Sequence, residues 1–177
     1  MPRRISVLSG PLGIGKTTTC LQLADLARRR GLACAGLVCP ARFEGPRKVG
    51  IDVLNLRTGE RRLLAEADDL PAELRTPGYR FDASALAWGA TVLAAACPCD
   101  LLIVDEIGPL ELERRQGWVN VFDLLRADSF KSAVVVVRPH LLNAFEQAVG
   151  RRPLRRFMLP APARVDLLKT ILSPADR

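Results

Sequence analysis

The segment 5–17, ISVLSGPLGIGKT, decides the fold of this chain. It opens with a short apolar run, Ile5–Ser9, which predicts a buried strand. The glycine-rich turn that follows leads into an amphipathic stretch, Thr17–Arg30, which ends before Gly31 and predicts a helix. Residues 10–17 match the phosphate-binding pattern G-x-x-x-x-G-K-[ST] at every fixed position, between a strand and a helix as that pattern requires.

The chemistry of phosphate binding explains the spacing of this loop. Gly10 and Gly15 allow backbone angles that other residues avoid, so successive N–H groups can point toward one centre. The helix that begins near Lys16 adds the positive end of its dipole. We expect Lys16 to reach the β- and γ-phosphates and the Thr17 hydroxyl to bind Mg²⁺. The predicted nucleotide contacts are Gly10, Pro11, Leu12, Gly13, Ile14, Gly15, Lys16, Thr17 and Thr18, although Thr18 is equally well explained as a first-turn helical residue.

A pair of carboxylates follows a second apolar run. Leu101–Val104 predicts a buried strand that delivers Asp105 to the carboxyl edge of the sheet, where open α/β sheets bind their ligands. Asp105 can there hold Mg²⁺ and its water shell as the Walker B acid. Glu106 can orient or deprotonate an attacking water. Residues 105–108 also satisfy the D-x-x-G pattern of GTPases, but the chain contains no N-K-x-D from which to build a guanine pocket.

The remaining pattern alternates strands with helices. Strands are predicted at 32–38, 49–56, 61–64, 101–105, 132–137 and 156–159, and helices at 83–96, 118–126, 140–149 and 164–172. Buried strands that alternate with helices predict a single three-layer α/β domain over residues 1–177, with a mostly parallel sheet. The stretch 49–64 predicts a hairpin, which would add antiparallel strands at one edge.

One further arginine is placed by this arrangement. The strand predicted at 132–137 could be inserted between the strands at 5–9 and 101–105. It would then end at Val137 and put Arg138 near the γ-phosphate. Positive charge at that point stabilises the transition state of phosphoryl transfer, so Arg138 is a candidate catalytic residue beside Lys16 and Glu106. A solvated arginine at a strand end explains Arg138 equally well. Arg114 and Arg115 are weaker candidates for the same role.

Composition excludes several classes of function. The 177 residues are 49% hydrophobic, and no apolar run approaches the length of a membrane span. The net charge of +7 comes with basic clusters at 28–30 and 151–156, but aromatic residues make up only 5%, so a nucleic-acid partner is not favoured. The five cysteines occur without an export signal and predict reduced thiols. We therefore expect a cytoplasmic monomer without a membrane partner.

These motifs together resemble the thermophile-type nucleoside triphosphatase family. Beside the phosphate loop, the resemblance rests on Gly36–Val38 leading to KVGID at 48–52, on LRTGER at 56–61 and on DEIGPLEL at 105–112. It implies a RecA-like sheet and slow, base-tolerant, Mg²⁺-dependent hydrolysis of ATP, GTP and other nucleoside triphosphates to the diphosphate and phosphate. After its second strand the family usually carries a threonine, acidic residues and an arginine, and this chain has CPARF at 39–43. Arg42 and Arg47 are candidates for that arginine.

Two other functions fit the same motifs. One is a P-loop kinase that phosphorylates a nucleoside or another small acceptor, for which the arginine-bearing stretch 42–80 could supply a lid over the acceptor. The other is a non-catalytic or partner-gated nucleotide-binding module. Release of phosphate in the absence of an acceptor separates hydrolysis from both alternatives.

Overall fold

The computed structural model describes residues 4–67, 78–127, 129–150 and 152–159. Within these ranges nine strands form one sheet in the order β6-β5-β4-β2-β7-β8-β1-β9, and β3 pairs with β4 outside this path. The strands are β1 (Arg4–Ser9), β2 (Cys34–Val38), β3 (Ala41–Glu44), β4 (Arg47–Asn55), β5 (Arg61–Ala67), β6 (Tyr79–Phe81), β7 (Cys99–Ile107), β8 (Phe130–Val137) and β9 (Leu154–Met158). The helices are α1 (Lys16–Arg29), α2 (Ala83–Ala94), α3 (Pro109–Leu112), α4 (Asn120–Ala127), α5 (Leu142–Val149) and the 3₁₀ turn η1 (Pro139–Leu141).

The centre of the sheet is parallel. Strands β2, β7, β8, β1 and β9 all run in one direction, and β8 lies between β7 and β1. Val135 of β8 is in register with Val7 on one side and with Val104 on the other. The predicted mostly parallel sheet and its inserted strand are therefore confirmed. The carboxyl ends of β1 and β7 lie at the same edge of the sheet.

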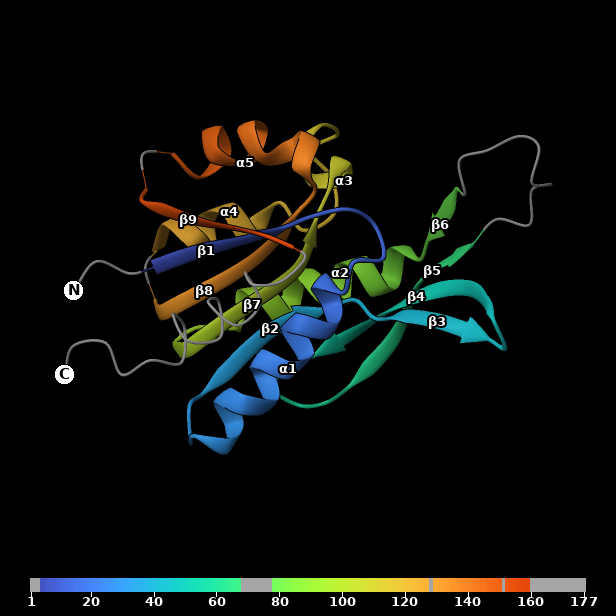
Figure 1. Cartoon of the computed structure of the whole chain (residues 1–177), viewed down its shortest axis with the longest axis horizontal. Helices are drawn as coiled ribbons and strands as arrows, with labels where there is room; N and C mark the ends of the chain where they lie inside the picture. Colours follow the sequence, from blue (N-terminus) through green and yellow to red (C-terminus); the bar gives the residue numbers. More distant parts are fainter. Residues whose placement is uncertain (1–3, 68–77, 128, 151, 160–177) are drawn as a thin grey trace.

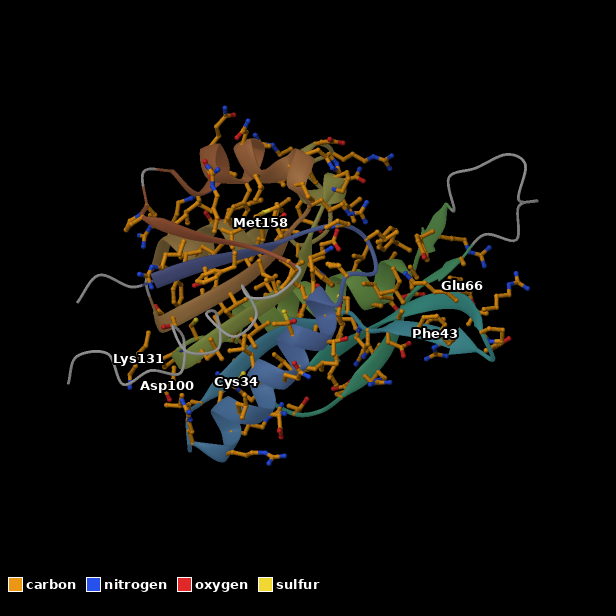
Figure 2. All side chains as sticks on the ribbon, viewed as in Figure 1. Cys34, Phe43, Glu66, Asp100, Lys131 and Met158 are labelled. Atoms are coloured by element: carbon orange, nitrogen blue, oxygen red, sulfur yellow. The ribbon has the colours of Figure 1, made fainter. Side chains whose placement is uncertain are left out.

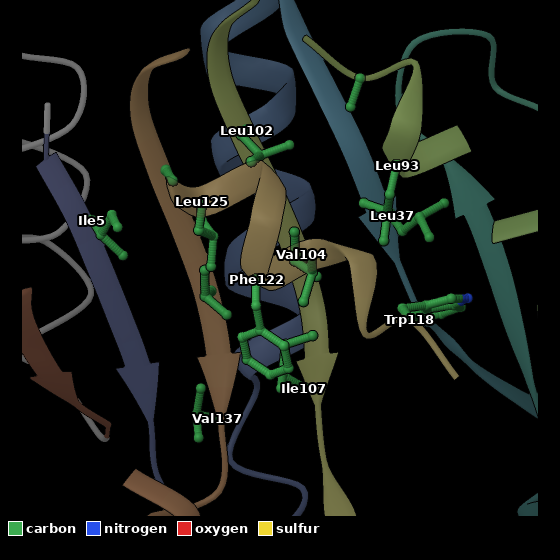
Figure 3. Packing of buried hydrophobic residues seen from close by; sticks show 14 of the residues in the cluster. Ile5, Leu37, Leu93, Leu102, Val104, Ile107, Trp118, Phe122, Leu125 and Val137 are labelled. Carbon is green, nitrogen blue, oxygen red and sulfur yellow. The ribbon is translucent and has the colours of Figure 1, made fainter. Parts of the chain in front are cut away.

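Helices cover both faces of this central sheet, as Figure 1 shows. On one face, α1 packs over alternate strand residues such as Leu8, Ile103 and Val136. On the other face, α2, α4 and α5 pack over a larger cluster, in which Phe122 and Leu125 lie near Leu102 and Val104 (Figure 3). Strands covered on both faces need apolar residues on both, which explains why their sequences are continuous apolar runs. Among the described residues no helix is both long and apolar enough to span a membrane.

An antiparallel arm is attached at one edge of the sheet. Strand β4 runs antiparallel to β2, and β5, β6 and β3 extend the arm beyond the central strands. Figure 2 shows Phe43 and Glu66 on this arm, well away from the Lys131–Asp100 ion pair at the amino ends of β8 and β7. The predicted hairpin at 49–64 is confirmed, and it continues outward to residues 47 and 67.

Three short elements, β3, β6 and α3, were not predicted. Strand β6 has only three residues. Strand β3 has four exposed residues without apolar alternation, and it forms by pairing with β4 around the turn at Gly45. Helix α3 has only four residues and begins at Pro109, too few for a periodic pattern. The helix predicted at 164–172 lies outside the described residues.

Strand β2 lies close against the β7 backbone at Gly36. A Cβ on this residue would lie 1.9 Å from the Ile103 carbonyl oxygen, and its φ of +114° is one that residues with side chains rarely adopt. Only glycine allows β2 to remain this close to β7. The Gly36–Val38 segment of the family resemblance therefore has a structural basis here.

Replacement of Gly36 by alanine should force β2 away from β7. We expect Gly36→Ala to lower the free energy of unfolding by about 3 kcal/mol or more, measured by urea denaturation followed by circular dichroism. Gly59→Ala is the matched control, because its φ is +79° but its added Cβ meets nothing within 4 Å. The free energy of unfolding of the control should fall by only about 1–2 kcal/mol. Equal losses in the two variants would contradict the close approach at Gly36.

Candidate active site

The phosphate loop connects β1 to α1 at the carboxyl edge of the sheet. Gly15 precedes the helix with φ +97° and ψ 25°, a left-handed conformation that turns the chain into α1. Pro11, Leu12 and Gly13 are exposed at the tip of the loop, and Leu12 is 82% exposed. Ile14 is half-buried and packs against the cluster beneath α1.

Lys16 lies folded against this loop. Its side chain is 7% exposed, and Nζ donates hydrogen bonds to the carbonyl oxygens of Gly10 and Pro11, each at 2.8 Å. The ammonium group is thus held by the loop that supplies the candidate phosphate-binding N–H groups. The first turn of α1 places Thr17 half-buried and Thr18 exposed.

Asp105 meets the phosphate loop from β7. It is 1% exposed, accepts a hydrogen bond from the Thr17 hydroxyl, and accepts a second from the Cys39 backbone N–H at 3.3 Å. Burial raises the pKa of Asp105 to about 7, and the hydrogen bonds from Thr17 and Cys39 oppose that rise. The structure therefore brings together the two residues that the sequence proposed as Mg²⁺ ligands.

Glu106 and Arg138 form an ion pair across two neighbouring strands. Glu106 belongs to β7, Arg138 follows the last residue of β8, and Arg138 Nε donates to Glu106 Oε1. Both side chains keep access to solvent, with 24% of Glu106 and 45% of Arg138 exposed. Arg138 thus lies at the carboxyl end of the inserted strand, as predicted from its position in the sequence. Arg114 and Arg115 are exposed on the loop after α3.

The arginines of the arm have structural partners. Asp52, only 4% exposed, pairs with Arg42 at 2.7 Å and with Arg61 at 3.6 Å. Arg57 donates to the carbonyl oxygens of Ala95 and Ala96 at the end of α2. Arg42, considered above as a replacement for a family arginine, therefore ties β3 to the buried carboxylate of β4. Arg47, the other candidate, lies exposed opposite Glu44 in the same hairpin.

No role was predicted for Glu111, which is buried near Glu106 in the structure. Its side chain is 4% exposed and accepts hydrogen bonds from the backbone N–H groups of Gly108 and Trp118, both at 3.1 Å. The sequence does carry a signal for the first of these bonds, because a glutamate three residues after a helix cap often accepts from the backbone of the cap.

Comparison with known proteins places this geometry in a family. The family model described as "NTPase" matches residues 5–172. The chain is 35% identical to the nucleoside-triphosphatase THEP1 of Methanopyrus kandleri over 77% of its length and 74% of the relative's. It is 28% identical to the THEP1 protein of Caldivirga maquilingensis, over 77% of this chain and 78% of the relative.

Two solved structures share the fold. The solution structure of a human cancer-related nucleoside triphosphatase superposes with a TM-score of 0.70 at 22% identity, covering 98% of this chain and 100% of the human one. The crystal structure of THEP1 from Aquifex aeolicus gives a TM-score of 0.65 at 19% identity, covering 98% and 99% of the two chains. The RecA-like three-layer fold is thereby confirmed. The match to the family model shows that this chain belongs to the NTPase family, which confirms the resemblance drawn from its motifs and the prediction that it is a nucleoside-triphosphatase.

Proposed function

We propose that this chain hydrolyses nucleoside 5′-triphosphates to the diphosphate and phosphate, with Mg²⁺, at the edge where the phosphate loop meets β7 and β8. The contact between Thr17 and Asp105 carries the proposal. It puts a hydroxyl and a carboxylate, both hard oxygen ligands, beside the loop that matches a phosphate-binding pattern.

The residues at this edge suit Mg²⁺ better than a metal ion whose ligands all come from the protein. Across the described ranges, no group of three or more His, Cys, Asp or Glu side chains could hold a metal ion. Mg²⁺ usually takes only one or two protein oxygens and completes its shell with water and substrate phosphates. Thr17 and Asp105 would hold the ion, which when bound neutralises charge on the β- and γ-phosphates.

The other side chains of the edge then have distinct tasks. Lys16 turns its ammonium from the loop carbonyls to the β- and γ-phosphates. Glu106 orients the attacking water and accepts its proton as the water oxygen bonds to the γ-phosphorus and the bond to the β–γ bridging oxygen breaks. Arg138 lies beside Glu106 and supplies positive charge to the γ-phosphate oxygens in the transition state.

The base is proposed to contribute little to recognition. Rejection of a wrong base requires buried polar groups that would be left unpaired, and the chain has no N-K-x-D segment to provide them for guanine. Affinity then comes mainly from the phosphates and Mg²⁺. We also propose that turnover is slow, as the family resemblance implies.

Substitutions at Lys16 and Glu106 should separate nucleotide binding from the hydrolysis step. Lys16→Ala should weaken nucleotide binding by about 1.5–3 kcal/mol or more, because a charge-assisted contact to phosphate is lost. Glu106→Gln should leave Mg·ATP affinity unchanged and slow hydrolysis by roughly 10²–10⁴-fold. Calorimetric titration gives the affinities and a phosphate-release assay gives the rates. Unchanged affinity in Lys16→Ala, or a parental rate in Glu106→Gln, would refute the corresponding assignment.

Asp105 should make stability in the absence of Mg²⁺ and nucleotide depend on pH. Because its pKa is raised from 3.8 to about 7 in the folded chain, folding favours the neutral carboxyl, and this contribution to stability is lost progressively as the pH rises from about 4 to about 7. The melting temperature of Asp105→Asn should therefore rise relative to that of the parent between pH 4 and pH 8, by the equivalent of a few kcal/mol at most. A difference in melting temperature that does not change between these pH values would show that the carboxyl is not held in this way.

A nucleotide panel tests base tolerance. We expect ATP, GTP, CTP and UTP to be hydrolysed with kcat/KM values within roughly tenfold of one another, about 1.4 kcal/mol in discriminating free energy. The measurement is steady-state phosphate release with Mg²⁺ at matched concentrations. A thousandfold preference for one nucleotide would reveal a dedicated base pocket.

A further inference from the structure

Glu111 closes the chain into a loop directly after Glu106. Its Oε2 accepts the Gly108 N–H and its Oε1 accepts the Trp118 N–H, so one buried carboxylate joins the two ends of the segment 108–118. Gly108 is only two residues beyond Glu106 and follows the last residue of β7. The carboxylate therefore fixes the backbone at the point where the chain leaves the candidate active site.

Trp118 anchors the far end of this loop in the core. Its ring is 2% exposed, its Nε1 donates to the Leu86 carbonyl oxygen at 3.0 Å, and it lies so close to Gly89 that a Cβ there would be 2.5 Å from Nε1. Both of these partners belong to α2. A continuous set of contacts thus runs from α2 through Trp118 and Glu111 to the backbone beside Glu106.

The space around Glu111 allows little movement of its carboxylate. A Cβ on Gly117, whose φ is +68°, would lie 2.3 Å from Glu111 Oε1. Burial raises the pKa of Glu111, and the hydrogen bonds from the Trp118 and Gly108 backbone oppose that rise. A carboxylate that is only 4% exposed depends on such hydrogen bonds.

We propose that Glu111 is a positioning residue for hydrolysis, which holds Glu106 in place by fixing the Gly108 backbone. The proposal rests on the proposed role of Glu106 as the residue that orients water. A misplacement of about 1 Å at a reacting group can cost about 100-fold in rate, so a support two residues away can control the chemical step. Nucleotide binding depends on β1, α1 and their loop, which Glu111 does not contact through these hydrogen bonds, so its loss should leave affinity intact.

Glu111→Gln tests this directly. The substitution keeps the size of the side chain but turns one of its two acceptors into an N–H donor that faces a backbone N–H. We expect kcat to fall roughly 10- to 100-fold, while KM and the affinity for Mg·ATP change less than about threefold. Glu113→Gln is the matched control, because it removes the same charge from an exposed position two residues along. It should keep the parental rate.

Gly117→Ala provides a second variant that leaves Glu111 itself unchanged. Its added Cβ displaces the Glu111 carboxylate, so it should show the same loss in kcat with unchanged affinity. Thermal melting and Mg·ATP titration identify which variants are folded. If both variants are folded and turn over at the parental rate, or if their affinity falls along with kcat, the proposal is overturned.

A double-mutant cycle with Glu106→Gln separates this proposal from the one on which it rests. If Glu111 acts through Glu106, then Glu111→Gln should add less than about threefold to the slowing already caused by Glu106→Gln in single-turnover hydrolysis. If the double variant is slowed by the product of the two single-variant factors, the positioning role of Glu111 is overturned, while Glu106 remains the water-orienting residue. If Glu106→Gln alone hydrolyses at the parental rate, the proposed function of Glu106 fails first, and the role of Glu111 fails with it.

Discussion

The parallel register of β1, β8 and β7 determines where every residue of the candidate site lies. Val135 is paired with both Val7 and Val104, and at the end of these strands the buried Ser9 hydroxyl donates to the Val137 carbonyl oxygen at 2.7 Å. Gly10 directly follows β1, and Arg138 directly follows β8. This register brings the phosphate loop, the acidic pair and Arg138, which are far apart in sequence, to one edge. A shift of one residue in β8 would reverse the faces on which its side chains lie and move Arg138 away from Glu106.

The same edge concentrates buried polar groups that would be costly elsewhere. Lys16, Asp105 and Glu111 are each less than a tenth exposed, and each is compensated by hydrogen bonds with backbone groups. Isolated burial of such charges would cost several kcal/mol, so their close placement must be supported by the rest of the fold. Burial raises the pKa of Asp105, and the hydrogen bonds from Thr17 and the Cys39 backbone oppose that rise.

Much of this could be predicted from sequence because it depends on local patterns. The phosphate loop, the apolar strand before Asp105 and the inserted strand before Arg138 each carry their signal within a dozen residues. The role of Glu111 could not be predicted in this way, because it depends on the return of the chain at Trp118 and on how that ring packs against α2. Arg42 could not be assigned either, since its partner Asp52 faces it only after β3 pairs with β4. The elements that were not predicted, β3, β6 and α3, are too short for a periodic pattern.

In the proposed reaction the chain transfers the γ-phosphoryl group to water. The most direct measurement is hydrolysis of ATP with Mg²⁺ in ¹⁸O-enriched water, followed by mass spectrometry of the products. Hydrolysis at the γ-phosphorus predicts inorganic phosphate that carries one oxygen from the solvent, ADP that carries none, and no requirement for a further acceptor. If no inorganic phosphate appears, and ADP forms only together with a phosphorylated alcohol or nucleoside acceptor, the chain is a kinase and the proposed roles of its active-site residues are wrong.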